Sequence, residues 1–352
     1  MSKTNSGNFF EDFRLGREIR HATPRTVTTG DVALYTALTG SRFALTSSDQ
    51  FARGLGLPVA PVDDLLAFNV VFGKTVPDVS LHAVANLGYA GGRFGVPVYP
   101  GDTLTATSTV IGLKENSNRQ TGIVYVHSTG TNQRDEMVID YRRWVMVKKR
   151  DAALSPPEER VPELPEAVAA ADLVVPAGLS AAGWSAVLAG TPYLWEDYAV
   201  GEKIDHGDGM TIEEAEHMMA TRLWQNTARV HFNQHTEGQG RFGRRLIYGG
   251  HIISLARALS FNGLAGAVKL AAINGGRHTN PTFAGDTVYA WSEVLDKAAL
   301  PGHGDWGALR LRLVALKNRP AEDFPLKGGD GGYDPAVILD FDYWALMPRR
   351  SR

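Results

Sequence analysis

An internal repeat limits what this chain can fold into more than any other feature of its sequence. Six positions near the start recur 185 residues later (196 − 11): Glu11-Asp12-Phe13, Gly16, Ile19 and His21 are matched by Glu196-Asp197-Tyr198, Gly201, Ile204 and His206. Chance seldom keeps six positions in register, and self-similarity of this kind is the mark of a duplicated unit. The sequence therefore predicts two copies of one domain within 352 residues.

Two later segments show how far the copies stay aligned. The first is shifted by 184 positions (277 − 93) and the second by 200 (340 − 140): Arg93, Pro97 and Gly101-Asp102-Thr103 recur as Arg277, Pro281 and Gly285-Asp286-Thr287, and Asp140-Tyr141 and Trp144 recur as Asp340-Phe341 and Trp344. The difference predicts an insertion of about 16 residues (200 − 184) in the second copy, within the Gly- and Pro-rich segment 318–333. Segment 151–190, which contains Ser155-Pro156-Pro157, has the composition of a linker. We expect domains at 1–150 and 191–352.

Each copy contains one helical stretch and several alternating runs. Ile252, Leu255, Ala256 and Leu259 fall on one helical face, and segment 63–71 occupies the equivalent place in the first copy. The strand-like runs alternate with a period of two, as in Leu104, Ala106 and Ser108, in Ile139, Tyr141, Arg143 and Val145, and in Leu309, Leu311 and Leu313. This order predicts an α+β protein with a tandem (double) hot-dog fold, in which each half is an antiparallel sheet wrapped around one central helix.

Composition excludes several classes of protein. The formal net charge is only −2, with acidic and basic residues interspersed, so we expect neither nucleic acid nor a membrane as a partner. The absence of cysteine excludes disulfides, thiolate metal sites and a cysteine nucleophile. The ten histidines lack the spacing of a catalytic metal site, so no metal is expected. The first residues lack the apolar core of a signal peptide, which favours a cytoplasmic location.

Three segments of the second copy resemble the MaoC-like, (R)-specific enoyl-CoA hydratase family. They are WQNTARVH at 224–231, LIYGGHI at 246–252 and PTFAGDT at 281–287, and PVAPVDD at 58–64 extends the resemblance into the first half. In that family an Asp and a His of one loop activate water, and a glycine at the start of the hot-dog helix offers its N–H to the thioester oxygen. The resemblance places His231 on the family histidine and Gly250, preceded by Gly249, on the glycine.

The sequence departs from the family pattern at the aspartate. In the register set by His231, Asn226 occupies the aspartate position and Ala228 the position of the motif asparagine. The first copy has Ser41 and Thr46 where the second has Asn226 and His231. We therefore expect the second half to be catalytic and the first half to be a catalytically degenerate, substrate-binding half.

Hydration of an enoyl thioester needs a base near the β-carbon, a proton donor for the α-carbon, and dipoles directed at the enolate oxygen. We expect His231 to be the base, because imidazole accepts a proton near neutral pH. Asn226 cannot take a proton, so its expected role is to position the water. The backbone of Gly250 at a helix N-terminus suits the developing oxyanion. His235, Glu237 and His251 stay open as the second acid–base group.

Arginine residues crowd the same region. Arginine pairs with phosphate and carboxylate groups, so we expect the following to bind the substrate together with Gly249: Arg229, Arg244, Arg245, Arg93 and Arg277. Arg222 and Arg241 lie nearby in the sequence. Such a cluster favours an acidic acyl group over a plain fatty acyl group.

The resemblance implies a hydro-lyase that acts on a short branched dicarboxylic enoyl-CoA, with mesaconyl-CoA and β-methylmalyl-CoA as the substrate pair. No cofactor is expected beyond the coenzyme A that is part of the substrate. Three alternatives stay open: (R)-specific hydration of other enoyl-CoAs, acyl-CoA thioester hydrolysis, and acyl-CoA binding without catalysis. Association into a homo-oligomer through exposed sheet edges is also open.

Overall fold

A computed structural model describes residues 3–154 and 157–350 of the chain, so Ser155 and Pro156 of the predicted linker lie outside the described residues. Its centre is one 11-stranded sheet with the order β1-β3-β4-β5-β2-β8-β11-β10-β9-β6, and β7 also pairs with β9. The strands are β1 (Glu18–Thr26), β2 (Ala83–Phe94), β3 (Thr103–Glu115), β4 (Thr121–Thr131), β5 (Met137–Lys148), β6 (Lys203–Asp205), β7 (Met210–Thr211), β8 (Lys269–His278), β9 (Thr287–Leu300), β10 (His303–Lys317) and β11 (Val337–Pro348).

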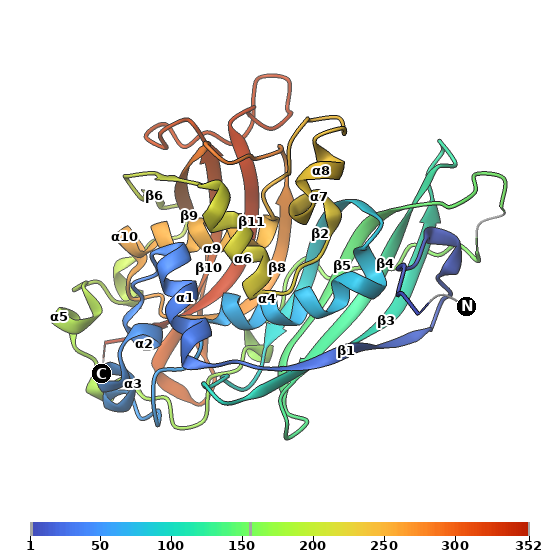
Figure 1. Cartoon of the computed structure of the whole chain (residues 1–352). Coiled ribbons are helices and arrows are strands. Elements are labelled where there is room, and N and C mark those ends of the chain that lie inside the picture. Colours follow the sequence, from blue (N-terminus) through green and yellow to red (C-terminus); the bar gives the residue numbers. More distant parts are fainter. Residues whose placement is uncertain (1–2, 155–156, 351–352) are drawn as a thin grey trace.

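The strands of the two halves follow the same order outward from the middle of the sheet. The order is β2-β5-β4-β3-β1 in the first half and β8-β11-β10-β9-β6 in the second. β2 and β8 are repeat-related strands, and they pair antiparallel with Tyr89 opposite Gly276. The sequence predicted a separate sheet for each half, whereas the structure joins the two through this pair. In Figure 1 the strands of the first half, β1 to β5, lie toward the right of the view, and β8 to β11 of the second half lie to their left.

The helices cover both faces of the sheet. The long central helices pack with Tyr343 and Ala345 of β11 (Figure 1), whereas the helical residues within 44–55 and Ala189 pack with Trp344 and Leu346, which point to the opposite face. The helices are α1 (Thr29–Thr39), α2 (Ala44–Ser47), α3 (Asp49–Gly54), α4 (Asp64–Thr75), α5 (Ala186–Ala189), α6 (Glu214–Leu223), α7 (Arg229–Phe232), α8 (Gln234–Glu237), α9 (Gly249–Leu259) and α10 (Phe261–Leu264), with short helical turns at Phe10–Asp12, Val76–Ser80, Ala170–Asp172, Ala181–Gly183 and Trp195–Asp197. The two predicted central helices are α4 and α9, and both are almost entirely buried. They meet where Asn69 Nδ2 donates to Ser254 Oγ at 3.2 Å. The predicted α+β class is confirmed.

The repeated histidines join the outer strands to the rest of each half. His21 on β1 contacts Ser108 Oγ at 2.8 Å, and His206, just after β6, contacts Ser292 Oγ at the same distance. The other ring nitrogen of His206 lies 2.7 Å from the Asn262 carbonyl oxygen. The repeated motif at these positions therefore serves the fold.

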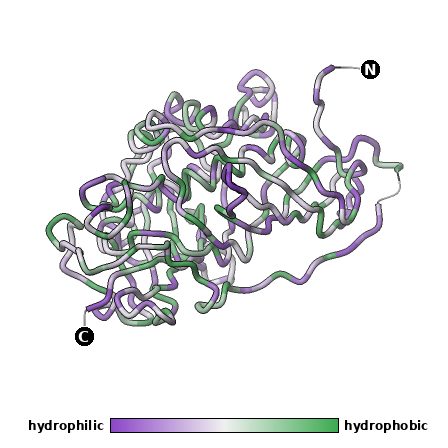
Figure 2. Tube along the Cα trace, turned by 90° about the horizontal axis from the view of Figure 1, so that it is seen from below, coloured by the Kyte–Doolittle hydropathy of each residue, from purple (hydrophilic) through white to green (hydrophobic). Residues whose placement is uncertain are grey.

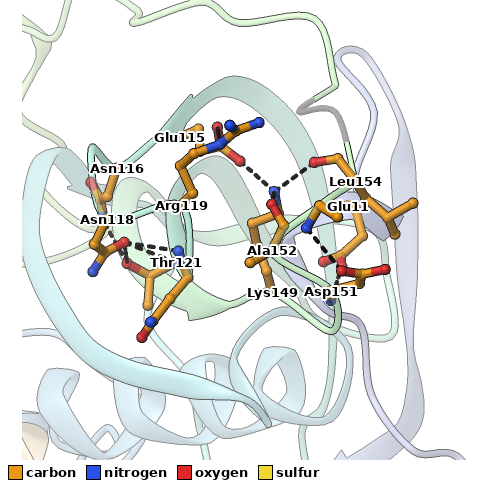
Figure 3. A network of polar contacts seen from close by, with 12 residues as sticks. Glu11, Glu115, Asn116, Asn118, Arg119, Thr121, Lys149, Asp151, Ala152 and Leu154 are labelled. Carbon is orange, nitrogen blue, oxygen red and sulfur yellow. Dashed lines mark hydrogen bonds and ion pairs between the residues drawn. The ribbon is translucent and has the colours of Figure 1, made fainter.

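The predicted insertion is confirmed between β10 and β11, which residues 318–336 connect, whereas residues 132–136 connect β4 to β5. After β5 the chain is held by Lys149, whose ammonium group pairs with Glu115 and donates to the Leu154 carbonyl at 2.7 Å (Figure 3). Glu11 accepts the backbone N–H groups of Arg150 and Asp151 in the same network. Beyond residues 155–156 the chain follows an extended, largely hydrophilic path along the outside of the molecule (Figure 2).

Candidate active site

A cavity of about 670 Å³ lies between the two halves and is lined by both. The first half contributes Phe72, Asn86, Tyr89 and Arg143, and the second half contributes Asn226, Arg229, Glu237, His231, Tyr248, Gly249 and His278, among others. The pairing of β2 with β8 and the contact between α4 and α9 bring these walls together. A cavity of this size can enclose a small acyl group.

His231 lies on α7 with its ring against Tyr248, at a centroid distance of 5.4 Å. Its Nδ1 lies 2.9 Å from the Leu246 carbonyl oxygen, which can only accept, so Nδ1 carries the proton. Burial lowers the pKa of His231 to about 4. The imidazole is therefore neutral near pH 7, with Nε2 as an unprotonated acceptor, which is the state that a general base requires.

Asn226 occupies the loop between α6 and α7 and is buried. Its Oδ1 accepts the Ala228 N–H at 3.1 Å, which fixes the orientation of the amide and uses one of the two lone pairs of the oxygen. The loop rests directly on α4, because a β-carbon at Gly73 would lie 1.8 Å from the Trp224 carbonyl oxygen. The first half thus supports the loop that carries Asn226 and His231.

The N-terminus of α9 forms another wall of the cavity. Gly249 is the first residue of the helix and lines the cavity, whereas Gly250 packs against α4. A β-carbon at Gly249 would lie 2.3 Å from His278 Nε2, and one at Gly250 would lie 2.1 Å from Asn69 Oδ1. The first N–H groups of a helix have no partner within the helix, so this end offers donors to an oxyanion.

His278, at the end of β8, is a site residue that the sequence analysis missed. Its Nε2 is buried without a hydrogen-bond partner among the described residues. Burial, together with His231, lowers the pKa of His278 to about 4. A comparison of the two copies could have revealed it. Directly after the repeated arginine, Arg93 or Arg277, the first copy has Phe94 and the second copy has His278.

The three open candidates for the second acid–base group occupy different surroundings. His251 is fully buried beneath the site, where its Nε2 contacts Glu216 Oε1 at 3.0 Å. His235 is exposed on α8 and is absent from the cavity wall, whereas Glu237 lines it. His217 accepts the Tyr248 N–H at 2.9 Å and holds the start of α9 in place.

Only one of the arginines predicted to bind substrate lies at the cavity, namely Arg229. Arg245 pairs with Glu214, and Arg244 stacks on Phe283 with its guanidinium carbon 4.2 Å from the ring centre. Arg93 and Arg277 lie on β2 and β8 and do not line the cavity. Of the two other arginines near in sequence, Arg241 lines the cavity and Arg222 lines a separate depression.

Packed side chains occupy the equivalent position in the first half. Ser41 Oγ lies 3.5 Å from Asp63, and burial raises the pKa of that carboxyl group. Arg257 covers the Phe43 ring at 3.6 Å, beside the fully buried Tyr343. Ser41 and Thr46 stand where the second half has Asn226 and His231, so this half offers no matching acid–base pair.

Within residues 3–154 and 157–350, no three acidic or histidine side chains are grouped so that they could hold a metal ion. No helix in the same described ranges is long and apolar enough to cross a membrane.

Comparison with known proteins agrees with this geometry. A crystal structure described as that of a MaoC domain protein dehydratase from Chloroflexus aurantiacus matches with a TM-score of 0.98 and 68% identity, over all of both chains. A Mycobacterium tuberculosis protein of double hotdog fold matches with a TM-score of 0.76 and 24% identity, over 97% of this chain and 99% of its own. The predicted double hot-dog fold and the MaoC-like class are confirmed.

The family can be stated more narrowly. The profile of the mesaconyl-CoA hydratase family matches residues 1–329. A β-methylmalyl-CoA dehydratase from Chloroflexus aurantiacus is 68% identical over 350 residues, which are 99% of each chain. The chain belongs to the mesaconyl-CoA hydratase family.

Proposed function

We propose that the chain catalyses the reversible hydration of mesaconyl-CoA to β-methylmalyl-CoA. The observation that carries the proposal is the placing of the neutral His231 imidazole and the N-terminus of α9 on the wall of one cavity. The names of the family and of the 68% identical relative describe the two directions of this reaction.

The roles follow from the positions of the side chains. His231 Nε2 takes a proton from water as the oxygen adds to the β-carbon, and Asn226 holds that water. The electrons move to the thioester oxygen, where the Gly249 N–H and His278 Nε2–H stabilise the enolate. Protonation of the α-carbon completes the addition and balances the proton taken by His231. Glu237 stays a candidate for that proton donor, together with His231 itself.

The two halves divide this work. Residues 191–352 supply the groups that move protons, and residues 1–150 supply the opposite wall of the cavity and the helix that supports the catalytic loop. Arg229 and Arg241, near the cavity, are suited to the phosphates of coenzyme A. The reaction is redox-neutral and needs only acid–base groups, so we propose no further cofactor. Cytoplasmic location and homo-oligomer formation stay predictions from the sequence.

The test is the loss of enoyl-thioester absorbance when the purified chain is incubated with mesaconyl-CoA. We expect turnover by the unaltered chain, a loss of about 100-fold or more in kcat for His231→Ala, and a smaller loss for Asn226→Ala. His235→Ala is the matched control, because His235 is exposed and lies off the cavity wall. Release of free coenzyme A thiol without formation of the hydrated product would identify a thioesterase. Binding of the ester without any turnover would identify an acyl-CoA binding protein.

A further inference from the structure

On the wall of the cavity lies a buried positive charge that has no counter-ion among the described residues. Arg143 of β5 is 1% exposed. Its Nη2 donates to the hydroxyl oxygens of Thr75 at 2.7 Å and Ser80 at 3.4 Å, and its Cζ lies 4.2 Å from the centre of the Phe72 ring. Its Nε and Nη1 have no hydrogen-bond partner within the described part of the chain. Burying a charge is costly unless an opposite charge or further hydrogen bonds compensate it.

Two of the other buried cations have counter-ions, whereas Lys74 and Arg257 donate, within the described chain, only to neutral acceptors and do not line this cavity. Lys149 pairs with Glu115 and Lys269 pairs with Asp64. The fold does not require a charge at the position of Arg143, because the repeat places the neutral Tyr343 at the equivalent position of the second copy (343 − 143 = 200). The repeat alone therefore does not account for a guanidinium group at this position.

The surroundings of Arg143 are poor in charge but rich in unused polar atoms. Both amide atoms of Asn86 and the hydroxyl group of Tyr248 are buried without a partner among the described residues, and both side chains line the cavity. The Phe72 ring beneath Arg143 lies 5.6 Å from the Tyr248 ring, which in turn lies 5.4 Å from the ring of the base His231. The unpaired guanidinium and the base thus belong to the same small space.

We propose that Arg143 binds the free carboxylate of the acyl group and so selects a dicarboxylic acyl-CoA. This inference rests on the proposed function and adds the residue that sets substrate choice. In mesaconyl-CoA the free carboxylate is attached to the β-carbon, where water adds, so its binding group must share the cavity with the base. A carboxylate supplies the missing negative charge and accepts the unused N–H groups.

The test compares acyl-CoA esters that differ only in this group. Calorimetric titration of the full chain uses two saturated esters, methylsuccinyl-CoA and 2-methylbutanoyl-CoA, in which a methyl group replaces the carboxylate. We expect Arg143→Met to weaken methylsuccinyl-CoA binding at least about 30-fold and to change 2-methylbutanoyl-CoA binding less than about threefold. Arg143→Lys keeps the charge but loses the planar fork. We expect this variant to bind the dicarboxylic ester about 10-fold more weakly and to bind the other ester as before.

Arg142→Met is the matched control. Arg142 is the neighbouring residue of β5, contacts Asp140 at 3.5 Å, and is absent from the cavity wall. Equal weakening of both esters by Arg143→Met, or no change in either, would overturn the proposal. Should Arg143→Met fail to fold, as seen by circular dichroism, the Arg143→Lys titration decides by the same criterion.

Turnover separates this inference from the proposed function. A chain that binds methylsuccinyl-CoA through Arg143 but does not hydrate mesaconyl-CoA would refute the hydratase reaction and support the carboxylate site. A chain that hydrates mesaconyl-CoA and (E)-2-methylcrotonyl-CoA with equal kcat/KM, before and after Arg143→Met, would support the reaction and refute the site.

Discussion

At the scale of single residues, burial sets the protonation state of the base. Burial lowers the pKa of His231 to about 4, below the ordinary value of 6.5, so the neutral form persists down to that pH. We expect kcat/KM for hydration to show no inflection near pH 6.5 and to fall only as pH approaches 4. Initial rates with mesaconyl-CoA between pH 4 and 8 measure this. An inflection near 6.5 that His231→Ala removes would contradict the assignment.

His278 is expected to act on the transition state rather than on binding. Its buried Nε2 lies beside Gly249 and has no partner among the described residues, so it can donate to the enolate oxygen. We expect His278→Phe, which copies the Phe94 of the first half, to lower kcat about 100-fold with little change in KM. His278→Gln keeps an N–H donor and should recover part of that loss. A change confined to KM would instead indicate a binding role.

Sequence reasoning located some of these residues and missed others for a definite reason. His231, Asn226 and Gly249 lie at the cavity because the motif spacing fixes them next to the start of the central helix. Arg143 was visible as the one charged residue in the alternating run Ile139, Tyr141, Arg143 and Val145, and the structure shows it buried. No local pattern tells whether such a residue faces a cavity that the other half completes.

At the scale of elements, the contact between α4 and α9 depends on Gly250. A β-carbon there would lie 2.1 Å from Asn69 Oδ1, an atom that has no hydrogen-bond partner among the described residues. We expect Gly250→Ala to lower the free energy of unfolding by about 1–3 kcal/mol, measured by denaturant titration. Asn69→Ala should relieve the clash. The loss of unfolding free energy in the double variant should therefore be smaller than the sum of the losses in the two single variants. Additive losses would show that the two residues do not interact.

Periodicity predicted both central helices and the strands that follow them, because each has one covered face. It could not predict that β2 and β8 pair, because a strand edge carries only backbone groups and no side-chain code for its partner. That pairing creates the cavity between the halves. The structure therefore adds the opposite wall of the site, which the motifs of the second half could not reveal.

At the scale of the whole molecule, four buried or partly buried histidines link folding to pH. Burial lowers the pKa of His206, His231 and His278 to about 4 and that of His217 to about 2. Below pH 6.5 the unfolded chain binds protons at these residues and the folded chain does not. The free energy of unfolding must then fall as pH falls from 6.5 toward 4, by about 2 kcal/mol for each histidine at pH 5.

The measurement is denaturant unfolding at a series of pH values between 7 and 5, where carboxyl groups of ordinary pKa are still ionised in both states. His206 gives the clearest control, because it lies outside the cavity and contacts the Asn262 carbonyl and Ser292. His206→Gln should lower the free energy of unfolding at pH 7. The variant should also bind about one proton fewer on unfolding, because it lacks that imidazole, so its free energy of unfolding should depend less steeply on pH. A slope equal to that of the unaltered chain would mean that His206 is protonated in the folded state. The contribution of histidine to the acid sensitivity of the fold would then come from His217, His231 and His278.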